Sequence, residues 1–157
     1  MSEAINTGIA PQAREQLAVG LSKLLADTYT VYLKTHGYHW NVRGPNFASL
    51  HGLFMTQYTE MWSAIDLVAE RIRALGELAP QGYRTFANLS AIQDGDPQKD
   101  ATGMLAELVK DHEALIAHVR PLLPTAQQAG DEVTTSLIAD RLTAHEKHAW
   151  MLRASLG

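Results

Sequence analysis

The stretch THGYHWNVRGPNFASLHGLFMTQYTEMWSAIDLVAERIRALG, residues 35–76, decides the fold of this chain. Apolar residues recur in it at three- and four-residue spacing on both sides of Gly44-Pro45, which predicts two amphipathic helices joined by a tight break. Four polar side chains on these apolar helical surfaces are able to bind a metal: His39, His51, Asp66 and Glu70. Such groups are costly next to an apolar stripe unless they are paired, and a divalent metal ion is one partner that suits them.

The spacing along the second helix predicts an oligomer. His51 and Asp66 are fifteen residues apart, which corresponds to roughly 22 Å along a helix axis. At 100° per residue the two side chains point within about 60° of each other, so they share one face. They are nevertheless too far apart to bind one ion. If they share a metal, a second copy of the helix must run antiparallel to the first.

The rest of the chain predicts a single all-α domain over residues 1–157, with residues 1–11 as a short tail. Proline and glycine between residues 77 and 99 indicate a long crossover, in which YRTFANLSAI is able to form a short helix. Four long helices with one long middle connection are typical of a ferritin-like four-helix bundle. The first two long helices are expected at 12–38 and at 46–75, with Gly76 as the C-terminal cap of the second. The third is expected from about residue 100, with an interruption at Pro121 and Pro124, and the fourth at 132–154.

Composition narrows the class of protein. The 157 residues contain no cysteine, which excludes disulfides and thiolate metal sites. No long apolar run and no signal pattern occurs at the start, so we expect a soluble, cytoplasmic protein. The net charge of −4, with scattered basic residues, argues against a strong nucleic-acid surface.

The motif HWNVRGPNFASLHGLF, followed by Tyr58 and DLVAER, resembles the Dps proteins, the miniferritins whose name means DNA-binding protein from starved cells. The likeness is dense over residues 30–76 and looser at 107–113 and 145–153. It implies a hollow shell of twelve subunits that binds Fe²⁺, oxidises it with hydrogen peroxide or, less well, dioxygen, and stores the ferric mineral, so that DNA is protected from oxidative damage.

The resemblance also implies roles for individual residues. His39 and His51 of one subunit, with Asp66 and Glu70 of another, correspond to the ferroxidase ligands. Trp40 and Trp62 would form the apolar walls of that site, although a place in the core of the subunit is an equally good interpretation.

Two departures from the family pattern concern the metal. Met55 stands where the family usually has an acid four residues after the second histidine, and a thioether binds iron poorly, so the second metal position is weakened. His145 and His148, one turn apart on the last helix, are candidate replacement ligands, but ordinary packing or hydrogen bonding of His148 is the stronger interpretation. The candidate acids of an access channel are Asp131, Glu132 and Asp140, with Thr134, Thr135 and Ser136 weakening the negative funnel.

Two other functions remain open at this point. One is a nucleoid protein that condenses DNA, which we expect to be weak or absent because only Arg14 is basic before the first helix becomes apolar. The other is a shell that sequesters zinc or another divalent ion without oxidising it.

Overall fold

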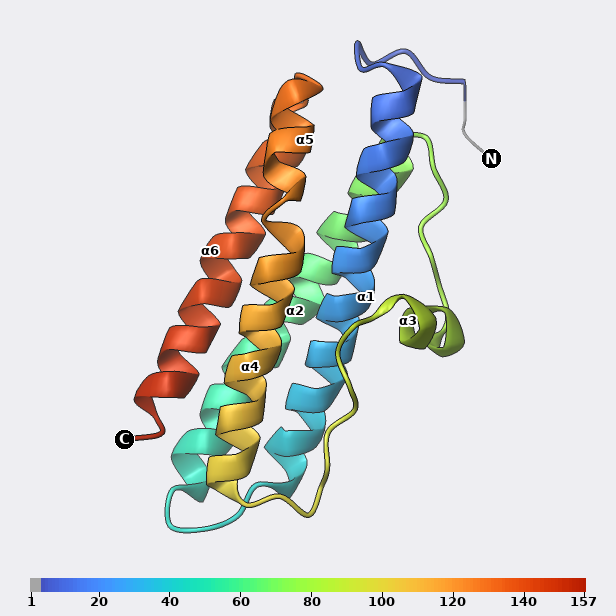
Figure 1. Ribbon diagram of the computed structural model, residues 1–157. Coiled ribbons are helices and arrows are strands. Elements are labelled where there is room, and N and C mark those ends of the chain that lie inside the picture. The colour runs from blue at the N-terminus through green and yellow to red at the C-terminus, as the bar shows by residue number, and fades with distance from the viewer. Residues whose placement is uncertain (1–3) are drawn as a thin grey trace.

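The computed structural model describes residues 4–157, which form six helices and no strand. The first three residues of the expected tail lie outside this range. The bundle consists of α1 (Pro11–Asn41), α2 (Phe47–Ala74), α4 (Ala101–Val119) and α6 (Glu132–Ala154), with the short helices α3 (Tyr83–Leu89) and α5 (Leu122–Gln128) (Figure 1). The prediction of an all-α bundle with a short helix in the crossover is confirmed.

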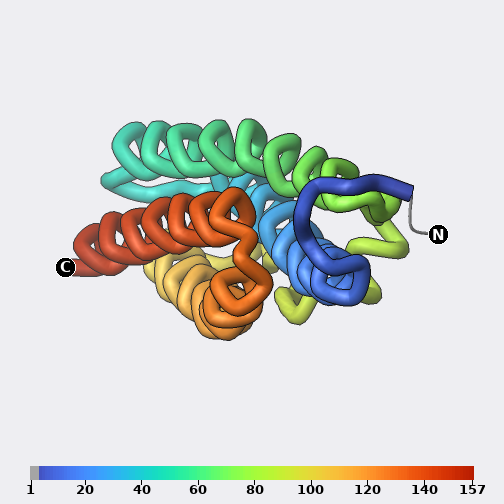
Figure 2. The backbone as a smooth tube through the Cα atoms, turned by 90° about the horizontal axis from the view of Figure 1, so that it is seen from above, coloured from blue at the N-terminus to red at the C-terminus, as the bar shows by residue number. Residues whose placement is uncertain are grey.

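The crossover between α2 and α4 fixes the topology of the bundle. It runs back along the bundle past α3, so α4 starts at the end where α1 finishes (Figure 1). The most extensive contacts join α1 to α2 and α4 to α6, and the view from above shows these two pairs side by side (Figure 2). No helix in the part of the chain that the structure describes is long and apolar enough to cross a membrane.

Glycine and proline end the helices where the sequence predicts. Gly76 has φ of 94°, and the Glu77 amide donates to the Ile72 carbonyl at 3.2 Å, which closes the end of α2 as expected. Pro121 and Pro124 divide the third long helix, because α4 ends at Val119 and α5 begins at Leu122. Proline is tolerated in the first turn of α5, where an amide hydrogen has no helical partner.

The buried side chains form two apolar clusters at different heights in the bundle. One contains Met61, Leu115 and Leu142, and the other contains Phe54, Leu108 and Leu152. The turns of α2, α4 and α6 that lie between these positions carry polar residues instead. The core is therefore divided by a polar layer, which consists of Glu60 of α2, His112 of α4, and Arg141, His145 and His148 of α6.

Candidate metal centre

His39 and His51 lie on either side of the break between α1 and α2. Their rings stack, with centroids 3.7 Å apart and planes 13° from parallel. His39 Nδ1 lies 2.7 Å from the backbone oxygen of His51, and His51 Nδ1 lies 2.7 Å from the backbone oxygen of His39. A carbonyl oxygen only accepts, so each Nδ1 carries the proton and donates it. Each Nε2 therefore holds a lone pair.

The two Nε2 atoms are arranged as separate ligands. Within residues 4–157, neither of them has a hydrogen-bond partner. An ion about 2.1 Å from one Nε2, in the plane of that ring, lies well outside the plane of the other ring. Because the planes are nearly parallel, the pair presents one nitrogen to each of two neighbouring positions.

Asp66 and Glu70 lie far from this pair in the single subunit. Both side chains are exposed, one turn apart near the end of α2. Among the residues that the structure describes, no three histidine or carboxylate side chains are arranged to hold a metal ion. The structure thus brings the two histidines together and leaves the two carboxylates elsewhere on the surface.

Aromatic side chains cover the outer face of α1 and α2. Trp40 is 64% exposed and Trp62 is 58% exposed, so the interpretation of either as a core residue of the subunit is wrong. The two tryptophans continue the apolar faces of their helices, so their spacing is the same as that of core residues. These faces extend beyond the subunit's own core. Tyr58 packs edge-on against the His39 ring at 5.2 Å.

His36 belongs to this aromatic face and was missed in the sequence. Its ring lies 4.2 Å from Trp40 and 4.4 Å from Tyr58. Burial and the neighbouring His39 lower the pKa of His36, so its imidazole is neutral at neutral pH. Its position three residues before His39, on the same helical face, is the signal that would have found it. Met55, by contrast, is 51% exposed and takes no part in the core.

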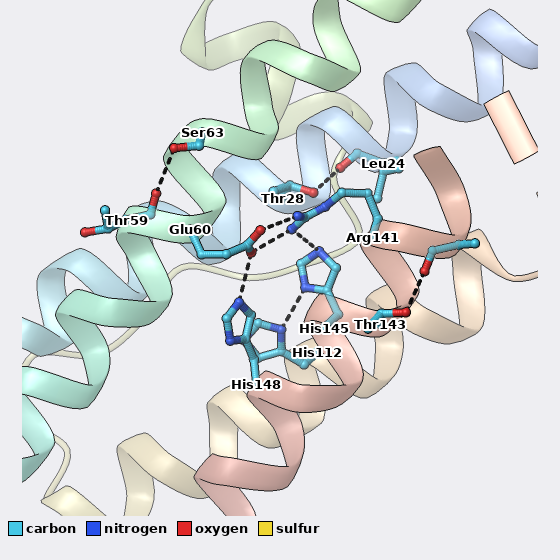
Figure 3. A network of polar contacts seen from close by, with 11 residues as sticks. Leu24, Thr28, Thr59, Glu60, Ser63, His112, Arg141, Thr143, His145 and His148 are labelled. Carbon is cyan, nitrogen blue, oxygen red and sulfur yellow. Dashed lines mark hydrogen bonds and ion pairs between the residues drawn. The ribbon is translucent and has the colours of Figure 1, made fainter. Parts of the chain in front are cut away.

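His145 and His148 lie inside the bundle, in the polar layer (Figure 3). His148 Nε2 is 2.9 Å from Glu60 Oε1, and the Arg141 guanidinium contacts both Glu60 and His145 Nε2. No contact joins either histidine to His39 or His51 in the described residues. The structure thus favours the interpretation of His148 as a hydrogen-bonded interior residue over that of a replacement ligand.

Burial controls the ionisation of this layer. Desolvation, with smaller contributions from His148 and Arg141, lowers the pKa of His112 to about 3. Desolvation and the neighbouring His112 and Arg141 lower the pKa of His145 well below its usual value. Burial alone would raise the pKa of Glu60, but hydrogen bonds from His148 and Arg141 outweigh it and lower this pKa to about 2. The layer therefore holds neutral His112 and His145 around an ionised Glu60–Arg141 pair.

The three candidate channel acids differ in their surroundings. Asp131 is buried, caps α6 by accepting from the Thr134 amide at 2.9 Å, and pairs with Arg71 at 2.9 Å. Burial would raise its pKa, but the Thr134 hydrogen bonds and Arg71 lower it. Asp131 therefore has a structural role in the subunit, and its place in a channel stays a prediction. Glu132 and Asp140 are exposed and remain candidates.

Comparison with known proteins identifies the family. A model of the ferritin-like domain matches residues 19–157. DNA protection during starvation protein 2 of Bacillus anthracis is 37% identical over 142 residues, covering 90% of this chain and 97% of that protein. A low temperature-induced protein of Nostoc sp. is 40% identical over 156 residues, covering 96% and 85%.

Solved structures agree with these relatives. The Dps protein of Vibrio cholerae O1, described as a member of a broad superfamily of ferritin-like diiron-carboxylate proteins, superposes with a TM-score of 0.93 at 32% identity, covering 100% of this chain and 99% of that one. The Dps protein of Bacillus brevis superposes with a TM-score of 0.89 at 32% identity, covering 93% and 98%. The chain belongs to the Dps proteins of the ferritin-like family.

Proposed function

We propose that this protein is a cytoplasmic miniferritin. Twelve subunits would form a hollow shell that binds Fe²⁺ at sites between subunits, oxidises it with hydrogen peroxide or dioxygen, and stores the ferric mineral, thereby protecting DNA from oxidative damage. The observation that carries this proposal is the reciprocal bonding of His39 and His51, because it leaves two Nε2 lone pairs without a partner in the described residues. Holding the protonated nitrogen on a carbonyl is the usual way in which a protein orients a histidine ligand.

The carboxylates of the site would come from a second subunit. In one chain the imidazoles and the acids are separated by roughly 22 Å along α2, and an antiparallel copy of α2 would bring Asp66 and Glu70 to the histidine pair. The exposed apolar residues on the outer face of α1 and α2 support such a contact, since large apolar surfaces usually mark an interface. They are Phe47, Trp40, Trp62 and Leu67.

The ligand set suits the oxidation of iron. Carboxylate oxygens are hard ligands that favour Fe³⁺ over Fe²⁺, while imidazole accommodates Fe²⁺. The stacked rings favour two neighbouring iron positions with one histidine each. Each Fe²⁺ then gives one electron to hydrogen peroxide, the O–O bond breaks, and two protons complete two waters. No hydroxyl radical is released when both electrons arrive together.

Stopped-flow oxidation of Fe²⁺ by hydrogen peroxide tests this function. The pair of substitutions His39→Ala and His51→Ala should slow oxidation by at least about tenfold, because the site loses its imidazoles. His118→Ala is the matched control, since His118 is an exposed histidine on α4, and it should oxidise iron at the wild-type rate. Equal rates in the histidine-pair variant and the control would contradict the proposal.

The same nitrogen donors suit zinc, so a shell that sequesters Zn²⁺ without turnover is the second candidate. Metal binding without peroxide-driven oxidation in the wild-type protein would favour it. DNA condensation is disfavoured by the net charge of −4. A gel shift that weakens steeply with added salt would show phosphate contacts and reopen that possibility.

A further inference from the structure

Lys34 is a buried lysine of α1 that takes no part in the proposed iron chemistry. Its Nζ lies 2.6 Å from Glu107 Oε1 and 2.7 Å from Asp111 Oδ2. Both carboxylates belong to α4, one turn apart. The Lys34 Nζ also donates to the backbone oxygen of Gln93, in the crossover, at 3.0 Å. A lysine amine is therefore held against two carboxylates at a largely buried position.

The two carboxylates have different surroundings. Glu107 accepts a hydrogen bond from the Tyr38 hydroxyl at 2.8 Å and pairs with Lys99. These partners favour the ionised form of Glu107. Asp111 Oδ2 is buried and has no hydrogen-bond partner in the described residues, although Lys34 Nζ is 2.7 Å away. The close approach of these two atoms therefore lacks the angles of a hydrogen bond.

Burial makes the ion pair of Lys34 and Asp111 costly. Two charges that are removed from water lose solvation, which their attraction repays only when the hydrogen-bond geometry is good, and this contact lacks such geometry. Burial also raises the pKa of Asp111, although Lys34 and Lys99 lower it. A neutral acid is thus easier to form here than in water. A covalent amide between the two groups would remove both charges from the interior.

We propose that Lys34 and Asp111 condense to an amide bond that joins α1 to α4. A proton passes from the Lys34 ammonium to the Asp111 carboxylate, which leaves a neutral amine beside a neutral acid. The Lys34 nitrogen then bonds to the carboxyl carbon of Asp111, and the bond from that carbon to the hydroxyl oxygen breaks. Glu107 takes the surplus proton from the nitrogen and gives it to the departing hydroxyl, so one water leaves. The step needs no oxidant or other co-reactant.

The surroundings of Lys34 supply what this condensation requires. The amine and the acid are held in contact, which replaces the encounter of two molecules by a step within one. Glu107 lies 2.6 Å from the attacking nitrogen, within the reach of a general base. The side chains of Lys34 and Asp111 are only 2% and 13% exposed, and a site that excludes water favours its loss over hydrolysis of the amide.

The mass of the intact, denatured chain tests the proposal. The wild-type chain should be lighter than its sequence by one water. Lys34→Arg keeps the positive charge but has no amine to condense, so it should have the full mass of its own sequence. Lys23→Arg is the matched control, because Lys23 is an exposed lysine of the same helix, and this variant should still lose the water.

Digestion with trypsin locates the bond. It should yield one branched peptide that joins residues 24–43 to residues 111–141, because trypsin cleaves neither after an amidated Lys34 nor between Arg120 and Pro121. The branched peptide should be absent from Lys34→Arg and present in Lys23→Arg.

Two further variants separate a covalent bond from an ion pair. Asp111→Asn should lose one ammonia in place of one water, because the leaving group is then the amide nitrogen. Glu107→Gln should slow bond formation by at least about tenfold, so that freshly purified chains have the full mass and lose water on standing. If Glu107→Gln does not fold, Glu107→Asp retains a shorter carboxylate and should form the bond at an intermediate rate.

Two results would overturn the inference. One is a wild-type chain with the full mass of its sequence, which would show that Lys34 and Asp111 form an ion pair only. The other is a loss of water that persists in Lys34→Arg. Neither result bears on the proposed iron site, because none of these substitutions alters a ligand of that site.

Discussion

His39 and His51 are each held by the backbone of the other. The Nδ1 atom of each histidine lies 2.7 Å from the backbone carbonyl oxygen of the other histidine. The two helix ends and the two imidazoles therefore form one unit. The turn between them therefore controls the position of both candidate ligands, and several measurable consequences depend on it.

The first prediction concerns Gly44, whose φ of 118° lies in the region that favours glycine. Gly44→Ala should destabilise the protein by about 1 kcal/mol, because the added Cβ strains this backbone. It should also weaken Co²⁺ binding in calorimetry, since the turn sets the histidine pair. Gly52→Ala is the control: Gly52 is helical with open space around its Cβ, so alanine should stabilise by up to about 1 kcal/mol. Equal effects of both substitutions would exclude a special role for the turn.

The second prediction concerns Met55. Met55→Glu should tighten Fe²⁺ binding and speed peroxide-driven oxidation, because it restores a carboxylate one turn after His51. The exposed side chain can be replaced with little change in packing. Calorimetric titration without oxygen measures the affinity, and Thr56→Glu adds the same charge on another face of α2. Unchanged affinity and stoichiometry for Met55→Glu would show that position 55 does not face the metal.

The third prediction is a loss of stability in acid. The folded-state pKa of His112, about 3, lies below the unfolded value near 6.5, so the unfolded chain takes up the proton first. The contribution of neutral His112 to the free energy of unfolding is fully present above pH 6.5 and is lost as the pH falls towards 3. Glu60 acts in the same direction, with its contribution lost between pH 4.5 and about 2.

Between pH 6.5 and 4.5 the preferential protonation of His112 in the unfolded chain should lower the free energy of unfolding by about 2 kcal/mol. Thermal unfolding followed by circular dichroism measures it. His112→Leu should lower the stability at pH 7 and flatten its pH dependence. A His112→Leu protein that is as acid-sensitive as the wild type would refute this assignment.

The fourth prediction separates the acids at the start of α6. Asp131→Ala should destabilise the protein by about 3 kcal/mol, because it leaves Arg71 without its buried partner and removes the cap of α6. Glu132→Gln should leave stability unchanged and slow iron uptake, since an exposed acid contributes only to the local field. Urea unfolding and uptake kinetics distinguish them. Slow uptake with normal stability in Asp131→Ala would show that Asp131 acts in the channel.

Much of the fold could be predicted because it depends on local pattern. Three- and four-residue spacing located the four long helices, and Gly44-Pro45, Gly76, Pro121 and Pro124 located their ends. The break between α1 and α2 also placed His39 beside His51, because a tight turn leaves no other arrangement.

The polar layer could not be predicted, because its partners are distant in the sequence. Glu60 meets Arg141 across 81 residues and His148 across 88, and no periodicity records such pairing. Arg71 and Asp131 are likewise 60 residues apart. The exposure of Trp40 and Trp62 escaped prediction for another reason, since a helix face that is buried by a second subunit has the same pattern as one buried in the core.

Complementation between subunits tests the central claim most directly. One variant carries His39→Ala and His51→Ala, and the other carries Asp66→Ala and Glu70→Ala, so each alone should be inactive. When the two variants are unfolded together in equal amounts and reassembled, half of the twofold pairs are mixed. In each mixed pair, one of the two sites regains all four ligands. Ferroxidase activity should therefore return to roughly one quarter of the wild-type value. No recovery in correctly assembled mixed shells would contradict a site shared between subunits.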